Sequence, residues 1–440
     1  MSIRPPNILF LFPDQQRPDW IGPTSDLPLR TPSIDRIANE GVTFATCYSN
    51  SPLCAPARAC LASGRRYERC GVPNNRYDYP LDQPTYYQLL RDAGYRVAGC
   101  GKFDLHKDTL DWGLDGTRHI KEWGFTDGVD NEGKFDGSRS YAQDRSPKGP
   151  YMAALAERGY ADRYVEEHRA NKANRGAYTT VVPDDLYCDN WLSDNGLRLL
   201  SDIPIGTPWH LVVNFTGPHN PMDVTESMRR RWEDVEFPMP HGNDQSDYSA
   251  EDHLRNRQNY AAMVENIDRQ IGRFLDAVAA RGELENTVVI YSSDHGEMLG
   301  DHSSWGKSTW RWPSAHVPLV IKAPGAARGG RTKALASTHD LAATILDYAG
   351  VEVPEFMDAQ SLKPVLEAPE KTHRDVLLAG LDSANDSWRL AFDGRYKYVR
   401  HGDDRMLFDL ESDPWEDADI SATSPATADR LAAVLDDRGA

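Results

Sequence analysis

The stretch 7-NILFLFPDQ-15 contains the pattern that decides the fold. Residues Asn7–Phe12 form a continuous apolar run, which Pro13 ends and which is followed at once by Asp14 and Gln15. A strand with one solvated face alternates apolar and polar side chains, whereas a strand of a parallel sheet is covered on both faces and is apolar throughout. The stretch therefore predicts a buried strand that carries polar side chains at its carboxyl end.

A second strand ends in the same way. The run 287-TVVIYSSD-294 is again apolar and is followed by His295, and the segment 257–282 before it has apolar residues at helical spacing. The rest of the chain repeats this alternation of strands and helices, which is typical of a mainly parallel sheet covered by helices. We therefore expect an α/β fold with a large, mainly parallel sheet between helical layers.

The region 104–176 departs from this alternation. It is rich in charged residues, glycine and aromatic side chains, and we expect an elaborated loop with one amphipathic helix near 151–168. Long insertions of this kind often carry function. We expect this one to form a lid or a wall of the substrate site.

A second departure begins near Pro364. The sequence there becomes a series of short alternating strands, with a turn at Asp393 and Gly394. This pattern predicts a small antiparallel α+β subdomain at the C-terminus. The chain is accordingly divided into a catalytic domain, residues 1–363, and a C-terminal subdomain, residues 364–440.

Composition and charge exclude several classes of function. The chain has 440 residues, of which 40% are hydrophobic and 26% charged, as in ordinary globular proteins. Its net charge of −18 argues against nucleic-acid binding and against a large polyanionic substrate, although a local basic pocket can exist in an acidic protein. No segment has the length of a membrane span, and the first strand lacks the features of a signal peptide. We therefore expect a cytoplasmic protein with neither a membrane nor a nucleic-acid partner.

The two polar strand ends form a candidate metal site. Ligands of open α/β sheets bind at the carboxyl ends of the strands, where Asp14 and Gln15 follow one strand and Asp294 and His295 another. Two carboxylates, an amide oxygen and an imidazole suit a divalent cation. Each aspartate alone could instead cap the following helix. Because both strands end in the same manner, we favour the metal site.

Further cationic side chains lie at similar places. Lys102 follows a strand and has His106 nearby, His219 follows the strand that contains 209-WHLVVNF-215, and Lys307 lies in a loop shortly after His302. A single lysine or histidine in a loop is usually only solvated. Together, these side chains suit a pocket for a tetrahedral oxyanion, in which lysines neutralise oxygen charge and a histidine protonates a leaving oxygen.

Cys54 lies in the stretch 51-SPLCAPARACLASGR-65 and has three possible roles: a buried structural thiol, a metal ligand or a reactive group. The six cysteines contain no CxxC pair, which argues against a disulfide framework or a zinc site. The segment 54-CAPAR-58 matches the C-x-P-x-R signature of the type I sulfatases. Further motifs of that family follow in order along the chain: PNILFLFPDQQ, GCGKFDLH, GPHNP, SDHGEMLGDHSSWGK, HVPLVIKAPG and LFDLESDPWE. The chain therefore resembles a sulfatase of the alkaline-phosphatase-like superfamily.

This resemblance implies a cofactor chemistry. In the family the signature cysteine is oxidised by a formylglycine-generating maturation enzyme, and the hydrated aldehyde is the nucleophile: one hydroxyl attacks sulfur and the second expels sulfate. Ala57 stands where the signature frequently has a serine. Gln15 and His295 stand where many members have Asp and Asn, so we expect one divalent cation, Ca²⁺ first and Mn²⁺ as the alternative.

The resemblance also implies roles for individual residues. The metal ligands are Asp14, Gln15, Asp294, His295 and the modified residue 54. Arg58 holds the formylglycine hydrate, and the sulfate-binding or leaving-group residues are Lys102, His219 and Lys307. We add His106 and His302 as candidate substrate-binding residues, although Asp104 stands where the family often has a histidine.

The expected activity is hydrolysis of a small-molecule sulfate ester, such as a sulfated sugar. A hydrolase of phosphonate monoesters or phosphodiesters with the same architecture is the nearest alternative, because sulfur and phosphorus oxyanions share a tetrahedral shape. A second alternative is a non-catalytic metal-binding relative in which Cys54 stays a thiol. The sequence leaves the oligomeric state open.

Overall fold

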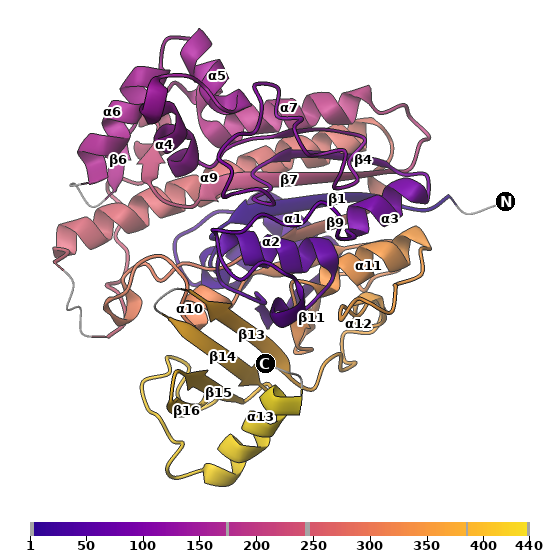
Figure 1. Ribbon diagram of the computed structural model, residues 1–440, viewed down its shortest axis with the longest axis vertical. Helices are drawn as coiled ribbons and strands as arrows, with labels where there is room; N and C mark the ends of the chain where they lie inside the picture. The colour runs from indigo at the N-terminus through magenta and orange to yellow at the C-terminus, as the bar shows by residue number, and fades with distance from the viewer. Residues whose placement is uncertain (1–3, 173–175, 243–246, 384–385, 438–440) are drawn as a thin grey trace.

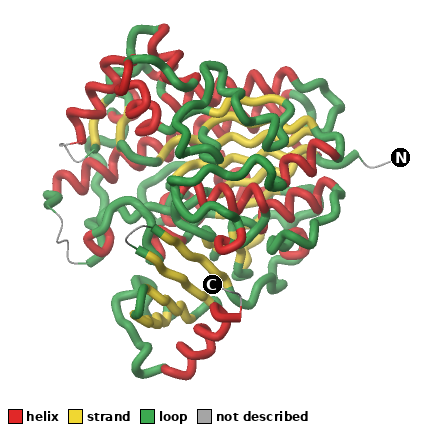
Figure 2. The backbone as a smooth tube through the Cα atoms, in the orientation of Figure 1, coloured by secondary structure: helices red, strands yellow, loops and turns green. Residues whose placement is uncertain are grey.

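The computed structural model of this chain describes residues 4–172, 176–242, 247–383 and 386–437. A large sheet lies between two layers of helices, and a smaller sheet lies beside it at the C-terminal end of the chain (Figures 1 and 2). The strands are β1 (Asn7–Asp14), β2 (Val42–Phe44), β3 (Cys47–Tyr48), β4 (Arg96–Gly101), β5 (Asp127–Asp130), β6 (Ala177–Thr179), β7 (Trp209–Pro218), β8 (Met222–Val224), β9 (Thr287–Ser292), β10 (Leu319–Lys322), β11 (Gly330–Thr332), β12 (Ala336–Ser337), β13 (Leu377–Asp382), β14 (Ser387–Phe392), β15 (Tyr396–His401) and β16 (Asp404–Asp409).

The helices account for most of the remaining regular structure. They are α1 (Pro32–Glu40), α2 (Cys54–Ser63), α3 (Tyr86–Asp92), α4 (Lys134–Asp144), α5 (Pro150–Glu157), α6 (Ala161–Lys172), α7 (Cys188–Asp202), α8 (Glu226–Arg229), α9 (Ala250–Ala280), α10 (Trp312–Ala315), α11 (Asp340–Ala349), α12 (Lys363–Glu367) and α13 (Pro425–Asp437). Within the described ranges, no helix combines the length and apolar character needed to cross a bilayer.

The large sheet has eight strands in the order β11-β2-β10-β9-β1-β7-β4-β5. Its neighbouring strands pair in parallel, except that β10 runs antiparallel to both β9 and β2. The predicted α/β fold with a large, mainly parallel sheet is confirmed. Four adjacent strands, β9, β1, β7 and β4, point their carboxyl ends in the same direction.

Strand β1 is covered on both faces, as its continuous apolar sequence predicts. Its alternate side chains enter two separate cores: Ile8, Phe10 and Phe12 on one face, Leu9 and Leu11 on the other. Helices α2, α3 and α11 cover the first face, and α1, α7 and α9 cover the second (Figure 1). Each large side chain buried in this way contributes about 1.5–3 kcal/mol, so the strand is firmly anchored.

The insertion 104–176 differs from the prediction in one respect. The single amphipathic helix expected near 151–168 is two helices, α5 and α6, and α4 precedes them. The break is at Gly159, whose φ of +76° lies in the left-handed region that glycine adopts without strain. There the amide of Tyr160 donates to the carbonyl of Leu155 at 2.7 Å, an arrangement that ends a helix.

The C-terminal strands form the predicted antiparallel sheet, in the order β13-β14-β15-β16. The turn between β14 and β15 contains Asp393 and Gly394, where it was expected, and Gly394 has a φ of +97°. Helix α13 packs Leu431 and Leu435 on one face of this sheet. The other face packs against Tyr48 and Trp310 of the large domain.

Gly101 ends β4, directly before Lys102, and its position allows no side chain. Its φ is +101°, and an added Cβ would lie 1.9 Å from the carbonyl oxygen of Asn214 on β7. We expect Gly101→Ala to lower the free energy of unfolding by about 3 kcal/mol or more. The cost of a left-handed backbone at alanine and the cost of the clash with the Asn214 carbonyl add together. Urea unfolding measures the loss.

Gly71→Ala is the matched control. Gly71 also has positive φ, +79°, but an added Cβ there would meet no described atom within 4 Å. Only the conformational strain, about 1–2 kcal/mol, should appear in this variant. Equal losses in the two variants would contradict the close approach of β4 to β7.

Candidate active site

The carboxyl ends of four adjacent strands bring the candidate residues together. β1 ends at Asp14, β9 is followed two residues later by Asp294, β4 is followed by Lys102, and β7 by His219. Because the strands are parallel neighbours, these residues lie at the same edge of the sheet. Helix α2 begins at the same place and supplies Cys54 at its first residue.

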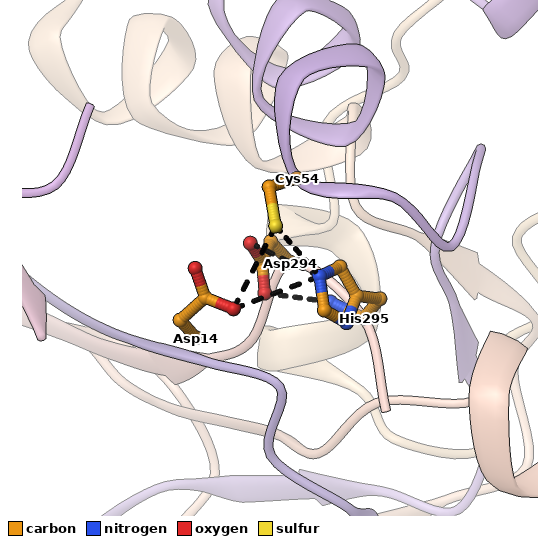
Figure 3. Close-up of side chains that lie close together, drawn as sticks. All are labelled: Asp14, Cys54, Asp294 and His295. Atoms are coloured by element: carbon orange, nitrogen blue, oxygen red, sulfur yellow. Dashed lines mark hydrogen bonds and ion pairs between the residues drawn. The ribbon is translucent and has the colours of Figure 1, made fainter. Parts of the chain in front are cut away.

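A compact group of four side chains lies at the centre of this edge. Potential ligand atoms of Asp14, Cys54, Asp294 and His295 all lie within 4.8 Å of one another, and all four residues are buried. Figure 3 shows the sulfur, the imidazole ring and the carboxylates pointing toward one another; Asp294 and His295 are consecutive residues, and Asp14 and Cys54 come from two other segments of the chain. Such a set of oxygen, nitrogen and sulfur atoms is suited to holding a divalent cation.

The hydrogen bonds of His295 leave one ring nitrogen directed at this group. Nδ1 lies 3.0 Å from the carbonyl oxygen of Gly296 and donates to it. Nε2 is the ring nitrogen that faces the group, and it lies 3.6 Å from carboxylate oxygens of both Asp14 and Asp294. A neutral imidazole fixed by a backbone carbonyl is the usual form of a histidine that binds metal.

Gln15 supplies a further acceptor. Its amide nitrogen Nε2 donates to Asn220 and to Glu297, whereas Oε1 is buried and has no hydrogen-bond partner among the described residues. Its backbone is left-handed, with φ of +69°, and its N–H donates to Asp294 at 3.0 Å. An unpartnered buried oxygen costs free energy unless it binds something, so the donor set fits a cation.

Arg58 neutralises both carboxylates from one turn further along α2. Its Nε donates to Asp294 at 3.0 Å and its Nη2 to Asp14 at 3.3 Å. Nη1 donates to the backbone of Lys102 and to Asn214 Oδ1. Although burial lowers the pKa of Arg58, the two carboxylates raise it above its ordinary value, so the guanidinium stays charged.

Two lysines flank the Cys54 sulfur. Lys307 Nζ lies 2.8 Å and Lys102 Nζ 3.4 Å from Sγ, and His295 Nε2 lies 3.3 Å from it. Burial and the charge of Asp14 raise the pKa of the thiol, but the lysines and the imidazole lower it further, to about 6. This environment stabilises negative charge at position 54.

Lys102 belongs to a network that the sequence did not reveal. Its Nζ contacts Asp14 and lies 3.1 Å from a carboxylate oxygen of Asp104. The Nζ of Lys107 lies 2.8 Å from the same carboxylate. Lys107 in turn contacts Asp136 at 2.7 Å. Burial raises the pKa of Asp104, but Lys102 and Lys107 lower it below its ordinary value, so Asp104 is charged and holds both ammonium groups in place.

His219 lies between the central group and the insertion. Its Nδ1 is 2.5 Å from the carbonyl oxygen of Asn220, and its ring meets that of Phe135 edge-on at 6.2 Å. Burial first, and then Lys307, lower the pKa of His219 well below its ordinary value. A histidine in this environment is mostly neutral in the free protein, and its protonated form gives up the proton readily.

The remaining two predicted histidines have other partners. His106 bonds Asp130 at 2.8 Å and packs among aromatic rings, and His302 lies near Arg311 and Asp417. Among the described residues, neither contacts the group around Cys54. Their assignment to substrate binding stays a prediction.

Three residues of the site escaped the sequence analysis: Lys107, Asn214 and Glu297. Lys107 directly follows His106, and only the loop conformation, with φ of +52° at Asp104, decides which side chain turns toward Lys102. Asn214 lies inside the buried strand β7, and a polar residue within this apolar run was the sequence feature that could have indicated a functional side chain. Glu297 lies two residues beyond His295 and orients Gln15.

A cavity of about 920 Å³ opens beside the group. It is lined by residues of the insertion, among them Phe135 and His168, and by Asn220, Glu297 and Gly306 next to the site. Phe135 also packs on His219, so the cavity lies on the His219 side of the central group. The arrangement can hold an oxyanion near Cys54 and a larger organic group in the cavity.

Comparison with known proteins identifies the relatives of the chain. A family model described as "Sulfatase" matches residues 6–351, and one described as "N-sulphoglucosamine sulphohydrolase, C-terminal" matches residues 300–435. The chain is 29% identical to a choline-sulfatase of Rhizobium meliloti, over 100% of this chain and 87% of the relative. It is 28% identical to an N-acetylglucosamine-6-O-sulfatase of Bacteroides thetaiotaomicron, over 84% of this chain and 72% of the relative. A solved phosphonate monoester hydrolase of Agrobacterium radiobacter has the same fold, with a TM-score of 0.82, 24% identity, and coverage of 98% of this chain and 94% of that one.

The charge environment of Cys54 can be measured directly in protein that keeps the thiol and has been freed of metal. We expect its ultraviolet thiolate absorbance to titrate with a pKa of about 6. Lys307→Met should move this transition to higher pH, because it removes the ammonium group 2.8 Å from the sulfur. Cys54→Ala is the control, because it lacks the thiol. If the unchanged protein and Cys54→Ala gave the same absorbance at every pH, the contacts of the lysines with the Cys54 sulfur would be contradicted.

Proposed function

The chain belongs to the sulfatase family of the alkaline-phosphatase-like superfamily and is a sulfuric ester hydrolase, and we propose that its nucleophile is a formylglycine hydrate made from Cys54. The observation that carries this proposal is the position of residue 54. Its side chain lies between Lys102, Lys307 and a candidate cation site, where an attacking oxygen would need stabilisation.

The residues around position 54 suit the two proton transfers of ester hydrolysis. Lys102 and Lys307 stabilise the negative charge of an attacking hydroxyl at that position after its proton has passed to solvent. His219 in its protonated form gives its proton to the alcohol oxygen as the bond from sulfur to that oxygen breaks. In the second half of the reaction His219 takes the proton of the remaining hydroxyl, sulfate leaves, and water restores the hydrate. The sum is sulfate ester plus water giving alcohol, sulfate and one proton.

We propose that Asp14, Gln15, Asp294 and His295 hold one divalent cation together with residue 54. The two carboxylates and the amide oxygen favour Ca²⁺, and the imidazole makes Mn²⁺ the alternative. When bound, the cation would lower the pKa of a hydroxyl at position 54 and neutralise part of the sulfate charge. Elemental analysis of the purified protein distinguishes the two metals.

The cavity beside His219 supports a sulfated sugar as the substrate. A leaving oxygen protonated by His219 must carry its organic group on that side, where Phe135 and the cavity begin. A volume of about 920 Å³ accommodates more than a small alcohol. We propose that the insertion 104–176 is the wall of this substrate site.

The cysteines support a proposal about maturation and location. All six are free thiols in the structure, and such thiols persist in a reducing compartment, which supports the cytoplasm as the proposed location. The formylglycine-generating enzyme would act on Cys54 within 54-CAPAR-58. Ala57→Ser restores the frequent form of the signature and should leave the extent of conversion equal or higher.

The proposal is tested first by the mass of the tryptic peptide Ile37–Arg58, from protein co-expressed with a formylglycine-generating enzyme. We expect an aldehyde or its hydrate at position 54. The same preparation should hydrolyse 4-nitrophenyl sulfate, and Cys54→Ala should reduce kcat by about 10³-fold or more, because the nucleophile is lost. An intact cysteine, beside a control sulfatase that has matured, would contradict the formylglycine proposal. Faster turnover of phosphonate or phosphodiester substrates would replace the sulfatase assignment.

A role of His219 as proton donor can be distinguished from a role in substrate binding. His219→Ala should lower kcat for an alkyl sulfate by about 10²- to 10⁴-fold, because an alkoxide cannot leave without a proton. The loss should be much smaller for 4-nitrophenyl sulfate, whose phenolate leaves unprotonated. Equal losses for both esters would show that His219 is not the proton donor.

A further inference from the structure

Two arginines of the insertion line the mouth of the cavity and have no partner there. Arg139 on α4 and Arg169 on α6 are both exposed and both line the cavity. Among the described residues, neither has an ion-pair or hydrogen-bond partner. The two helices pack against each other, at the upper left of Figure 1, so both guanidinium groups belong to one wall.

No acidic side chain of the cavity wall is available to them. Among the described residues that line the cavity, Glu297 is the single acidic one, and it is buried. Its carboxylate already accepts from Gln15, from the backbone of Leu299 at 2.9 Å and from that of Gly306 at 2.7 Å. The cavity mouth is therefore positive, in a protein whose net charge of −18 otherwise repels anions.

The position of Arg139 relative to the reacting centre follows from helix geometry. Phe135 packs on His219, and Arg139 lies four residues further along α4, so both occupy the same face of the helix. Four residues advance about 6 Å along a helix. A ligand whose ester oxygen contacts His219 must therefore extend past Phe135 to reach Arg139. The distance from Phe135 to Arg139 along the helix is comparable to the length of a sugar ring.

The same wall offers hydrogen bonds without charge. His168 packs edge-on against Phe135 at 5.9 Å, and both of its ring nitrogens lack hydrogen-bond partners among the described residues. Burial lowers the pKa of His168 to about 4, so the ring is neutral and supplies one donor and one acceptor. Tyr178, also in the wall, has an equally unpartnered hydroxyl. Such groups suit hydroxyls of a ligand.

Part of the cavity wall is aromatic. Tyr248 and Trp305 are stacked at 4.4 Å with an angle of 20° between their planes, and both line the cavity. Aromatic surface beside a few polar groups is the usual composition of a site for a ring-shaped ligand.

We propose that Arg139 and Arg169 form a subsite for a second anionic group, so that the substrate is a sugar carrying another sulfate or a carboxylate besides the ester that is cut. This inference rests on the proposed function, since it assumes that the ester lies at Cys54. The guanidinium groups bind the second anion through charge-assisted hydrogen bonds, and the cavity walls hold the ring between them.

The test compares two sugars with formylglycine-bearing enzyme. We expect kcat/KM for glucosamine-2-N,6-O-disulfate to exceed that for N-acetylglucosamine 6-sulfate by about tenfold, and this ratio to fall as salt rises. Arg139→Gln and Arg169→Gln should each lower the ratio by about three- to tenfold, mainly through KM, because each removes one contact to the second anion. Turnover of 4-nitrophenyl sulfate is measured in parallel.

Arg163→Gln is the matched control, because Arg163 is an exposed arginine of the same helix α6 that does not line the cavity among the described residues. It removes the same charge and should leave the ratio unchanged. Equal kcat/KM for the two sugars, or a ratio that Arg139→Gln and Arg169→Gln do not change, would overturn the subsite while the sulfatase activity stands. Absence of 4-nitrophenyl sulfate turnover would instead overturn the proposed function and with it this inference.

Discussion

The buried ion pairs of Arg58 with Asp14 and Asp294 are the interaction on which the site depends. Two carboxylates that are out of contact with water and a few ångströms apart repel each other and favour protonation. Arg58 donates a hydrogen bond to each carboxylate, and its positive charge offsets part of their repulsion. Because the arginine is one turn along α2 from Cys54, the same helix that neutralises the carboxylates also delivers residue 54 to them. Removal of either kind of partner would leave uncompensated charge in the interior.

The parallel sheet explains why these charges can meet. A strand buried on both faces cannot carry polar side chains along its length, so they are confined to its ends. β9, β1, β7 and β4 end side by side, and each presents its first polar residues at one edge. The apolar strands supply a rigid frame, and the loops beyond them supply the chemistry. The cost of ordering the site is thus offset by burial elsewhere in the sheet.

Charge is distributed on two scales. The protein as a whole is acidic, with a net charge of −18, yet lysines and arginine surround position 54, and two more arginines line the cavity mouth. An anionic ester would be repelled by most of the surface and attracted only where local cations outweigh it. The insertion joins the two cationic places, because Phe135 packs on His219 and Arg139 follows on the same helix face.

The sequence by itself determined the α/β fold, the C-terminal antiparallel sheet and the grouping of Asp14, Asp294 and His295, because continuous apolar strands followed by polar residues allow little other arrangement. Cys54 joined this group only through the resemblance to the sulfatases. The tertiary structure decided what loops do. The left-handed backbone at Gly159 splits one predicted helix into two, and the left-handed backbone at Asp104 turns Lys107 toward the site. His106 and His302 contact partners outside the group around Cys54. The tertiary structure also decided which surface arginines line the cavity, because Arg139 and Arg169 lie on different helices, α4 and α6, that come together only when the chain folds. Local sequence fixes where a strand ends, but the direction of a side chain beyond it depends on backbone angles that distant contacts select.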